Sequence, residues 1–357
     1  MAAMPPKLSR LIDSLRPSGT FGLHNSELKF RQPASAIAQL ETSWDLQLEC
    51  HQTDLHCGVV VEGLTGSVRL QGSSNQQQSS SAGELDLESV AYQGIQLTNV
   101  KGPMWVNESQ CLFGKWATDA TKQPERHLNG TVYGGTMVSD GWVQFAHTPL
   151  YQAEIAVAGA DLQRLMVERF GGRQSFTGKI DGRVLLKGEG PSLARLNGNG
   201  NVHIHEANIL ELPLLVSLLK ILRHGAPNST AFDQSDIDFK IQGPHITLNR
   251  IDFLGDVVDL YGYGETGFDE HVKLAFRAEL GPRDYALPFV KELVGTTTGN
   301  LMQLYVDGTL TDPKVATEAF PGFNQMLQQI RTDFEAGGGP AAREAARTDA
   351  FGRPLGR

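Results

Sequence analysis

Two cysteines and two histidines form a symmetric cluster near the start of the chain. Cys50, His51, His56 and Cys57 are residue types that bind zinc. Successive side chains of a strand point to opposite faces, so Cys50 and His51 diverge, as do His56 and Cys57. If residues 52–54 form a turn, the two cysteines share one face of a hairpin and could form a disulfide. Because the side chains alternate between the two faces of a strand, these residues are expected to line an apolar surface or to face solvent, and not to form a metal site. Whether Cys50 pairs with Cys57 stays open.

Two further patterns could bind ligands. Residues 261–267 (YGYGETG) have the spacing GxGxxG, which in a dinucleotide-binding fold lies between a strand and a helix. Residues 272–276 have the pattern of another strand, so we predict a glycine-rich hairpin instead. His203 and His205 share one face of a predicted strand, but the sequence shows no third metal ligand, which favours an exposed polar face.

No candidate catalytic residue lies within a recognisable catalytic motif. Asp233, Asp236 and Asp238 lie close together beside an apolar run, where mutually repelling carboxylates are expected to face solvent. Neither a nucleophile elbow nor a serine, histidine and acid motif is present. The sequence therefore predicts no catalytic residues, no metal and no cofactor. An enzyme of unrecognised type is kept only as a third hypothesis.

Composition and charge indicate which partners are not expected, and the N-terminal sequence bears on the cellular compartment. The chain has 357 residues and a net charge of −9, and no basic block interleaved with aromatic residues, so nucleic acid is not an expected partner. The N-terminus lacks the apolar core of a signal peptide, and no stretch reaches the roughly 18 apolar residues of a membrane-spanning helix. If the protein works outside the cytoplasm, we expect its anchor in an N-terminal part missing from this chain.

The elements are predicted to be mostly strands. Short runs with period-two alternation extend from about residue 20 to 157, and 39 glycines indicate many turns. Residues 72–83 (GSSNQQQSSSAG) are predicted to form a polar, mobile loop. Cys111 belongs to a predicted strand over residues 111–116.

Helices are expected to interrupt the strands of the second half. Asp161 is a suitable cap for a helix that ends near residue 170, and Pro213 suits the first turn of a helix that ends near residue 223. Further helices are predicted over residues 285–294 and 323–334. We predict four segments: an N-terminal helix or linker (1–19), a β-groove segment (20–159), a C-terminal region with capping helices (160–335) and a disordered tail (336–357).

The strands of the second half keep one apolar face, which requires a cover. Because no linker divides the chain into compact sandwiches, we predict an elongated, twisted, mainly antiparallel sheet that curls into an open hydrophobic groove. The predicted groove-lining residues are Phe239, Ile241, Leu248, Phe253, Leu260, Leu274 and Phe276.

A family resemblance adds to this interpretation. Residues 178–213 (GKIDGRVLLKGEGPSLARLNGNGNVHIHEANILELP) and 306–313 (VDGTLTDP) resemble the C-terminal region of the AsmA family, as do residues 128–135 (LNGTVYGG) followed by 151–165. The resemblance covers roughly residues 8–325. That family is similar to the bridge-like lipid transfer proteins, which have an inner-membrane helix and a long apolar β-groove.

The resemblance implies a function in the Gram-negative cell envelope. It implies passive phospholipid transport between the inner and outer membranes, supporting outer-membrane biogenesis, by a periplasmic protein tethered to the inner membrane. Phospholipid and the two membranes or their proteins are the expected partners. The alternative is a non-enzymatic periplasmic scaffold that assists outer-membrane protein assembly. A lid or membrane contact is one expectation for the apolar helix carrying Leu214, Leu215, Leu218, Leu219 and Leu222, and a buried capping helix is the other.

Overall fold

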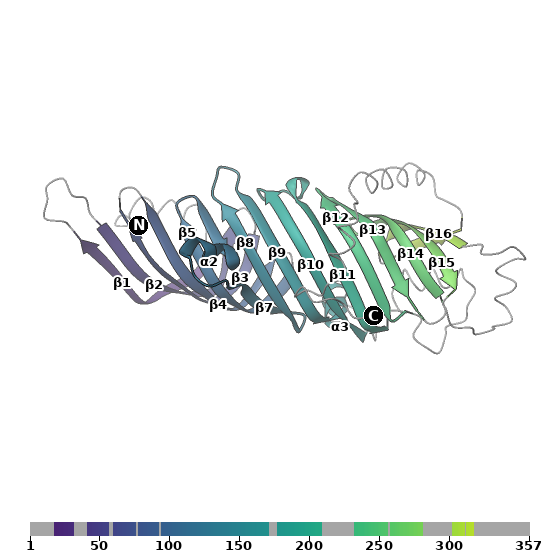
Figure 1. Ribbon diagram of the computed structural model, residues 1–357, viewed down its shortest axis with the longest axis horizontal. Helices are drawn as coiled ribbons and strands as arrows, with labels where there is room; N and C mark the ends of the chain where they lie inside the picture. The colour runs from purple at the N-terminus through teal and green to yellow at the C-terminus, as the bar shows by residue number, and fades with distance from the viewer. Residues whose placement is uncertain are drawn as a thin grey trace, which may run out of the picture. The chain divides into compact units, whose positions relative to one another are not determined.

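The protein is mainly β, as predicted, and its strands belong to one antiparallel sheet (Figure 1). The computed structural model describes residues 18–31, 41–56, 60–75, 78–92, 94–170, 177–208, 232–255, 258–280, 302–310 and 312–317. The chain divides into two units: residues 1–157 with 184–196, and residues 158–183 with 197–357. The strands β9 (Leu150–Asp161) and β10 (Thr177–Glu189) each contribute residues to both units.

The first unit begins as a meander in which each strand pairs with the next. Its strands are β1 (Ser18–Arg31), β2 (Glu41–His56), β3 (Val60–Ser74), β4 (Ser79–Tyr92), β5 (Ile95–Asn107), β6 (Gln110–Phe113), β7 (Leu128–Val132) and β8 (Gly135–Gln144). The strands β1 to β5 pair in chain order. Both β6 and β7 then pair with β5 on one side and β8 on the other, so together they occupy one strand position.

A short helix, α2 (Lys115–Thr121), is inserted where β6 ends and before β7 begins. The predicted strand over residues 111–116 is therefore wrong beyond Phe113. Gly114 turns the chain with a φ of 64°, and the buried carboxylate of Asp140 accepts a hydrogen bond from the backbone N–H of Lys115 at 2.7 Å. The same carboxylate bonds Nδ1 of His127 at 2.8 Å. Asp140 thus fixes both ends of the insertion, a long-range contact that local sequence does not reveal.

The predicted mobile loop over residues 72–83 is also wrong, because most of it is strand. Ser73 pairs with Ser80, and Ser74 with Ser79. A side chain at Gly72 would lie 2.8 Å from Nε1 of Trp44, so glycine leaves room for the indole. This indole N–H donates to the hydroxyl of Ser81 at 2.9 Å. Tertiary packing therefore makes a strand of a sequence whose composition favours a loop.

The second unit contains a second meander. Its strands are β11 (Asn197–Asn208), β12 (Gln234–Gln242), β13 (His245–Leu254), β14 (Val258–Gly267), β15 (His271–Leu280), β16 (Met302–Thr309) and β17 (Pro313–Ala316), which pair in chain order. A single 3-10 turn, η1 (Leu193–Arg195), precedes β11.

One predicted helix is confirmed as α3 (Leu162–Phe170). The Asp161 carboxylate accepts from the backbone N–H of Arg164 at 3.1 Å, as a capping residue does. Leu162 and Met166 of α3 pack in the core of the second unit. The helices predicted over residues 213–223, 285–294 and 323–334 lie outside the described residues, as does the predicted tail over 336–357. Of the predicted N-terminal segment 1–19, only Ser18 and Gly19 are described, and they begin β1.

The predicted glycine-rich hairpin is confirmed as the antiparallel pair of β14 and β15, and the glycines of the GxGxxG spacing lie within its first strand. Gly262 pairs with Phe276, and Gly264 with Leu274. A Cβ on Gly262 would lie 2.4 Å from Cδ1 of Phe276, and one on Gly264 would lie 2.2 Å from the carbonyl oxygen of Lys273. The glycines therefore let bulky neighbours cover the strand, which is a packing role and not a phosphate-binding one.

Substituting Gly264 tests this role. We expect Gly264→Ala to destabilise the protein by roughly 1–3 kcal/mol, because the new methyl group meets backbone atoms. Gly22→Ala is the control, since its Cβ would meet only the side chain of His24, at 3.1 Å. Denaturant unfolding measures both free energies, and equal values for the two variants would contradict the packing role.

Candidate apolar and polar faces

The seven predicted groove-lining residues share one face of the second unit. Phe239 pairs with Leu248, Phe253 with Leu260, and Leu274 with Gly264, which places these side chains on the same side of the sheet. Ile241 and Phe276 follow the same alternation. The side chains of Ile241, Phe253, Leu260, Leu274 and Phe276 are buried, while Phe239 and Leu248 are partly exposed.

This face forms a packed core. The Phe253 ring lies 5.9 Å from the Phe232 ring and 6.0 Å from the Phe276 ring, centroid to centroid. Leu162 and Met166 belong to the same cluster. Hydrocarbon would have to displace existing contacts to reach most of the predicted lining. The predicted lid residues, 214–222, lie outside the described residues.

A more accessible apolar surface lies in the first unit. We name it the β1–β3 apolar face, and it comprises Phe21, Leu23, Leu28 and Phe30 of β1, Trp44, Leu46 and Leu48 of β2, and Val68 and Leu70 of β3. Cross-strand pairs place these residues together: Leu23 with Leu48, Leu28 with Trp44, and Leu48 with Val68.

Exposure on this side of the sheet decreases from β1 towards β5. The four β1 residues are 49% (Phe21), 60% (Leu23), 54% (Leu28) and 61% (Phe30) exposed. Those of β2 and β3 are partly exposed. Leu87 of β4 and Val100 of β5, on the same side, are 4% and 5% exposed. Hydrocarbon therefore has direct access at β1 and progressively less access towards β5.

An irregularity in β1 is needed to build this surface. Leu23 and Leu28 are five positions apart, so in a regular strand they would point to opposite faces. The pairing with β2 shifts between His24 and Glu27, and Asn25 has a φ of 42°. This bulge brings Leu28 and Phe30 back to the face of Leu23. Sequence analysis did not single out these residues, although Phe21 with Leu23, and Leu28 with Phe30, alternate on either side of the bulge.

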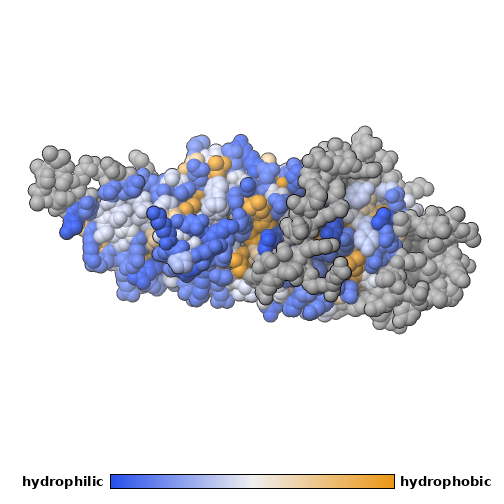
Figure 2. Space-filling model, viewed as in Figure 1, coloured by the Kyte–Doolittle hydropathy of each residue, from blue (hydrophilic) through white to orange (hydrophobic). Residues whose placement is uncertain are grey.

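The opposite side of these strands is polar. The Arg69 guanidinium donates to both oxygens of Asp45, at 3.1 and 2.8 Å, and the Gln71 amide donates at 2.7 Å. These hydrogen bonds, first that of Arg69 and then that of Gln71, lower the pKa of Asp45 to about 2. Charge is therefore kept to one side. On the face shown in Figure 2, most described residues are hydrophilic and hydrophobic residues form narrow bands.

The polar side of the second unit carries a row of charged residues. The rings of His203 and His205 stack with centroids 5.3 Å apart, as their shared face predicts. Nδ1 of His203 lies 2.8 Å from Asp236, and Nε2 of His205 lies 3.2 Å from Asp181. The predicted exposed polar face is thus partly buried and ion-paired. The Asp236 hydrogen bond raises the pKa of His203 and, reciprocally, lowers that of Asp236.

Arg250 continues this row. Its guanidinium lies 3.4 Å from Asp236, 3.6 Å from Asp238 and 2.6 Å from Asp252. Burial raises the pKa of the Asp238 carboxyl. The positive charge of Arg250 lowers this pKa, but by less than burial raises it. Of the three aspartates predicted to face solvent, Asp233 is exposed, whereas Asp236 and Asp238 are partly buried. Both of these share the Arg250 cation in an ion-pair network between strands.

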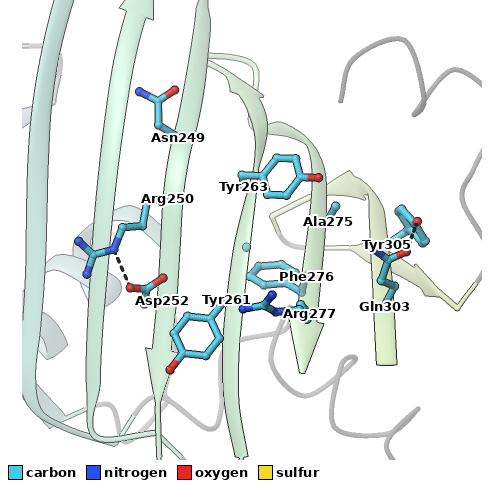
Figure 3. A pocket seen from close by; sticks show the side chains of 11 residues that line it. Asn249, Arg250, Asp252, Tyr261, Tyr263, Ala275, Phe276, Arg277, Gln303 and Tyr305 are labelled. Atoms are coloured by element: carbon cyan, nitrogen blue, oxygen red, sulfur yellow. Dashed lines mark hydrogen bonds and ion pairs between the residues drawn. The ribbon is translucent and has the colours of Figure 1, made fainter. Parts of the chain in front are cut away.

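A shallow depression of about 370 Å³ lies beside this network (Figure 3). Ala275 lies between Tyr263 and Tyr305, with which it pairs on β14 and β16. The Arg277 guanidinium lies 5.8 Å from the centre of the Tyr261 ring, and Tyr305 donates to Gln303 at 2.9 Å. The small Ala275 side chain between two larger rings accounts for the hollow.

The turn at residues 52–54 that would place the two cysteines on one face of a hairpin does not form. Residues 52–54 lie within β2, where Gln52 has a φ of 50° and the pairing shifts between Cys50 and Thr53. Cys57 lies outside the described residues, so whether it pairs with Cys50 stays open. Burial raises the pKa of the Cys50 thiol. No group of three or more His, Cys, Asp or Glu side chains could hold a metal ion within the part of the chain that the structure describes.

Comparisons with known proteins give no match, whether with family models, curated proteins or solved structures. The resemblance to the AsmA family therefore stays a prediction. No helix among the described segments is both long enough and apolar enough to cross a membrane.

The pairing of His203 with Asp236 predicts how the stability of the protein depends on pH. Because the folded-state pKa of His203 is raised, the stabilisation from its pairing with Asp236 is complete below the ordinary histidine pKa of about 6.5, and is lost as the pH rises through the higher folded-state value. We expect Asp236→Asn to lower the midpoint of the His203 titration, measured by NMR. Asp233→Asn, which changes an exposed carboxylate near the start of the same strand, is the control. An unchanged midpoint in Asp236→Asn would refute the coupling.

Proposed function

We propose that the protein binds the acyl chains of phospholipids on the β1–β3 apolar face, as a passive step in moving lipid between the inner and outer membranes. The observation that supports this is the high exposure of Phe21, Leu23, Leu28 and Phe30, on the same side as the partly exposed side chains of β2 and β3. A contiguous exposed apolar surface is typical of an interaction site. In this proposal no covalent step takes place, and the protein works in the periplasm.

Burial of hydrocarbon supplies the free energy of binding. Each buried methylene contributes about 0.8 kcal/mol. Because apolar contacts are not directional, a chain could shift along the face without losing specific bonds. The charged residues on the other side of β2 and β3, such as Asp45 and Arg69, leave this face free of competing polar groups.

The second unit favours a different function from lipid binding. Its apolar face is already filled by side chains such as Phe232, Leu260 and Leu304. A filled interior supports the alternative function, a non-enzymatic scaffold that assists outer-membrane protein assembly. Lipid binding is therefore proposed for the first unit, and the predicted lining of the second unit is expected to contribute little.

Trp44 provides a direct test, because its indole lies on the β1–β3 apolar face and is partly exposed. We expect vesicles of phosphatidylcholine with brominated acyl chains to quench the tryptophan fluorescence of the protein, since bromine quenches an indole that it contacts. The quenched component should disappear in Trp44→Phe. Steady-state fluorescence against vesicles with unbrominated chains measures the effect.

Trp142→Phe is the matched control. Trp142 pairs with Leu112, and Leu112 pairs with Trp105. Trp105 precedes Val106 on β5, so this row of side chains points to the side of the sheet opposite to Val106 and Val100, and away from the β1–β3 apolar face. Quenching should persist in Trp142→Phe. Absence of quenching in the wild-type protein, or quenching that survives in Trp44→Phe, would rule out lipid at this face and leave the scaffold function.

A further inference from the structure

The strand β1 has an outer edge that no other described strand pairs with. Within the described part of the chain it pairs only with β2, over most of its 14 residues. Every residue of the strand is exposed except Gly22, which is partly exposed. An edge of this kind presents backbone N–H and C=O groups to which another strand can add.

The strand β1 has a bulge and charged residues on its polar row, but it lacks two other usual protections of an edge strand. Residues 18–31 contain no proline, and no charged side chain points into the apolar row of Phe21, Leu23, Leu28 and Phe30. The bulge at residues 25–26 leaves a regular segment on each side. The apolar row and the open edge coincide, so an added strand would contact exposed side chains as well as backbone.

Charge indicates what kind of strand would fit. The polar row of β1 carries His24, Glu27, Lys29 and Arg31, and Lys29 forms an ion pair with Glu27 of its own strand at 2.9 Å. On the inner edge, acids of β2 meet the basic residues at both ends of this row, while Asp45 lies opposite Glu27. Glu49 lies 3.3 Å from His24, and Glu41 lies opposite Arg31. Thus β1 already pairs with a strand in which acids alternate with apolar residues.

We propose that the outer edge of β1 binds, by antiparallel strand addition, a segment of a partner protein in which apolar and acidic residues alternate. Main-chain hydrogen bonds hold such a strand, and alternate side chains give its specificity. Its apolar residues extend the β1–β3 apolar face by one strand, and its acids lie beside Lys29 and Arg31. A second copy of β1 would bring a second pair of basic residues and fits less well. The inference concerns the edge of the sheet and does not rest on lipid binding.

A peptide copied from β2 provides the probe. Residues 41–49, ETSWDLQLE, have the required alternation, and KTSWKLQLK reverses their charges. We expect the labelled acidic peptide to bind the full chain, and the basic peptide to bind several-fold more weakly, in fluorescence anisotropy. Lys29→Glu combined with Arg31→Glu should reverse this preference. Absence of binding at millimolar peptide, or equal binding of the two peptides, overturns the proposal.

Two further measurements separate the competing outcomes. Leu28→Lys places a charge in the apolar row and should weaken binding, whereas Phe268→Lys, at an exposed apolar residue after β14, should not. Hydrogen exchange of β2 amides should remain slow with peptide bound, because loss of their protection would mean that the peptide replaces β2. Self-association of the wild-type protein that Leu28→Lys abolishes would overturn the proposal in favour of a second copy.

Discussion

The structure depends on one constraint: a sheet whose side chains alternate must have its apolar face covered. In the second unit, Phe232 and residues of α3 pack with that face, and Leu260, Leu304 and Val306 are fully buried. In the first unit, Leu87 of β4 and Val100 of β5 are buried, whereas the apolar residues of β1 are exposed. The two units therefore meet the same constraint to different degrees, and the degree of coverage distinguishes a protein core from a surface available to a ligand.

Local departures from regular strand geometry keep the two faces separate. The bulge of β1 returns Leu28 to the apolar side, and pairing shifts in β12 and β13 accompany the placement of Asp238 and Arg250 on the polar side. Glycines such as Gly264 make room where neighbouring strands are bulky. Each pairing shift disrupts regular pairing locally, but it keeps charge out of the apolar face, where an unpaired charge would be far more costly.

Alternation made the mainly antiparallel sheet predictable from sequence, and capping chemistry at Asp161 made α3 predictable. The errors have a common physical cause. Gly72 and Ser81 form strand because Trp44 packs against them, and α2 forms because the Asp140 carboxylate reaches Lys115 from 25 residues away. Such contacts depend on the assembled sheet. Burial is equally non-local, so the sequence identified which residues share a face but not which of those faces are filled.

The coincidence of exposed face and open edge at β1 has a simple origin. A side chain on a sheet is shielded partly by its neighbours on the two adjacent strands. Leu87 of β4 lies between Val100 of β5 and the backbone of β3 at Gly66, whereas among the described residues Leu23 of β1 has a cross-strand neighbour, Leu48, on one side only. An added strand would supply the missing lateral contacts, and hydrocarbon would supply contacts from above. The two kinds of partner therefore shield different sides of the same residues, and binding of one leaves the contacts needed by the other in place.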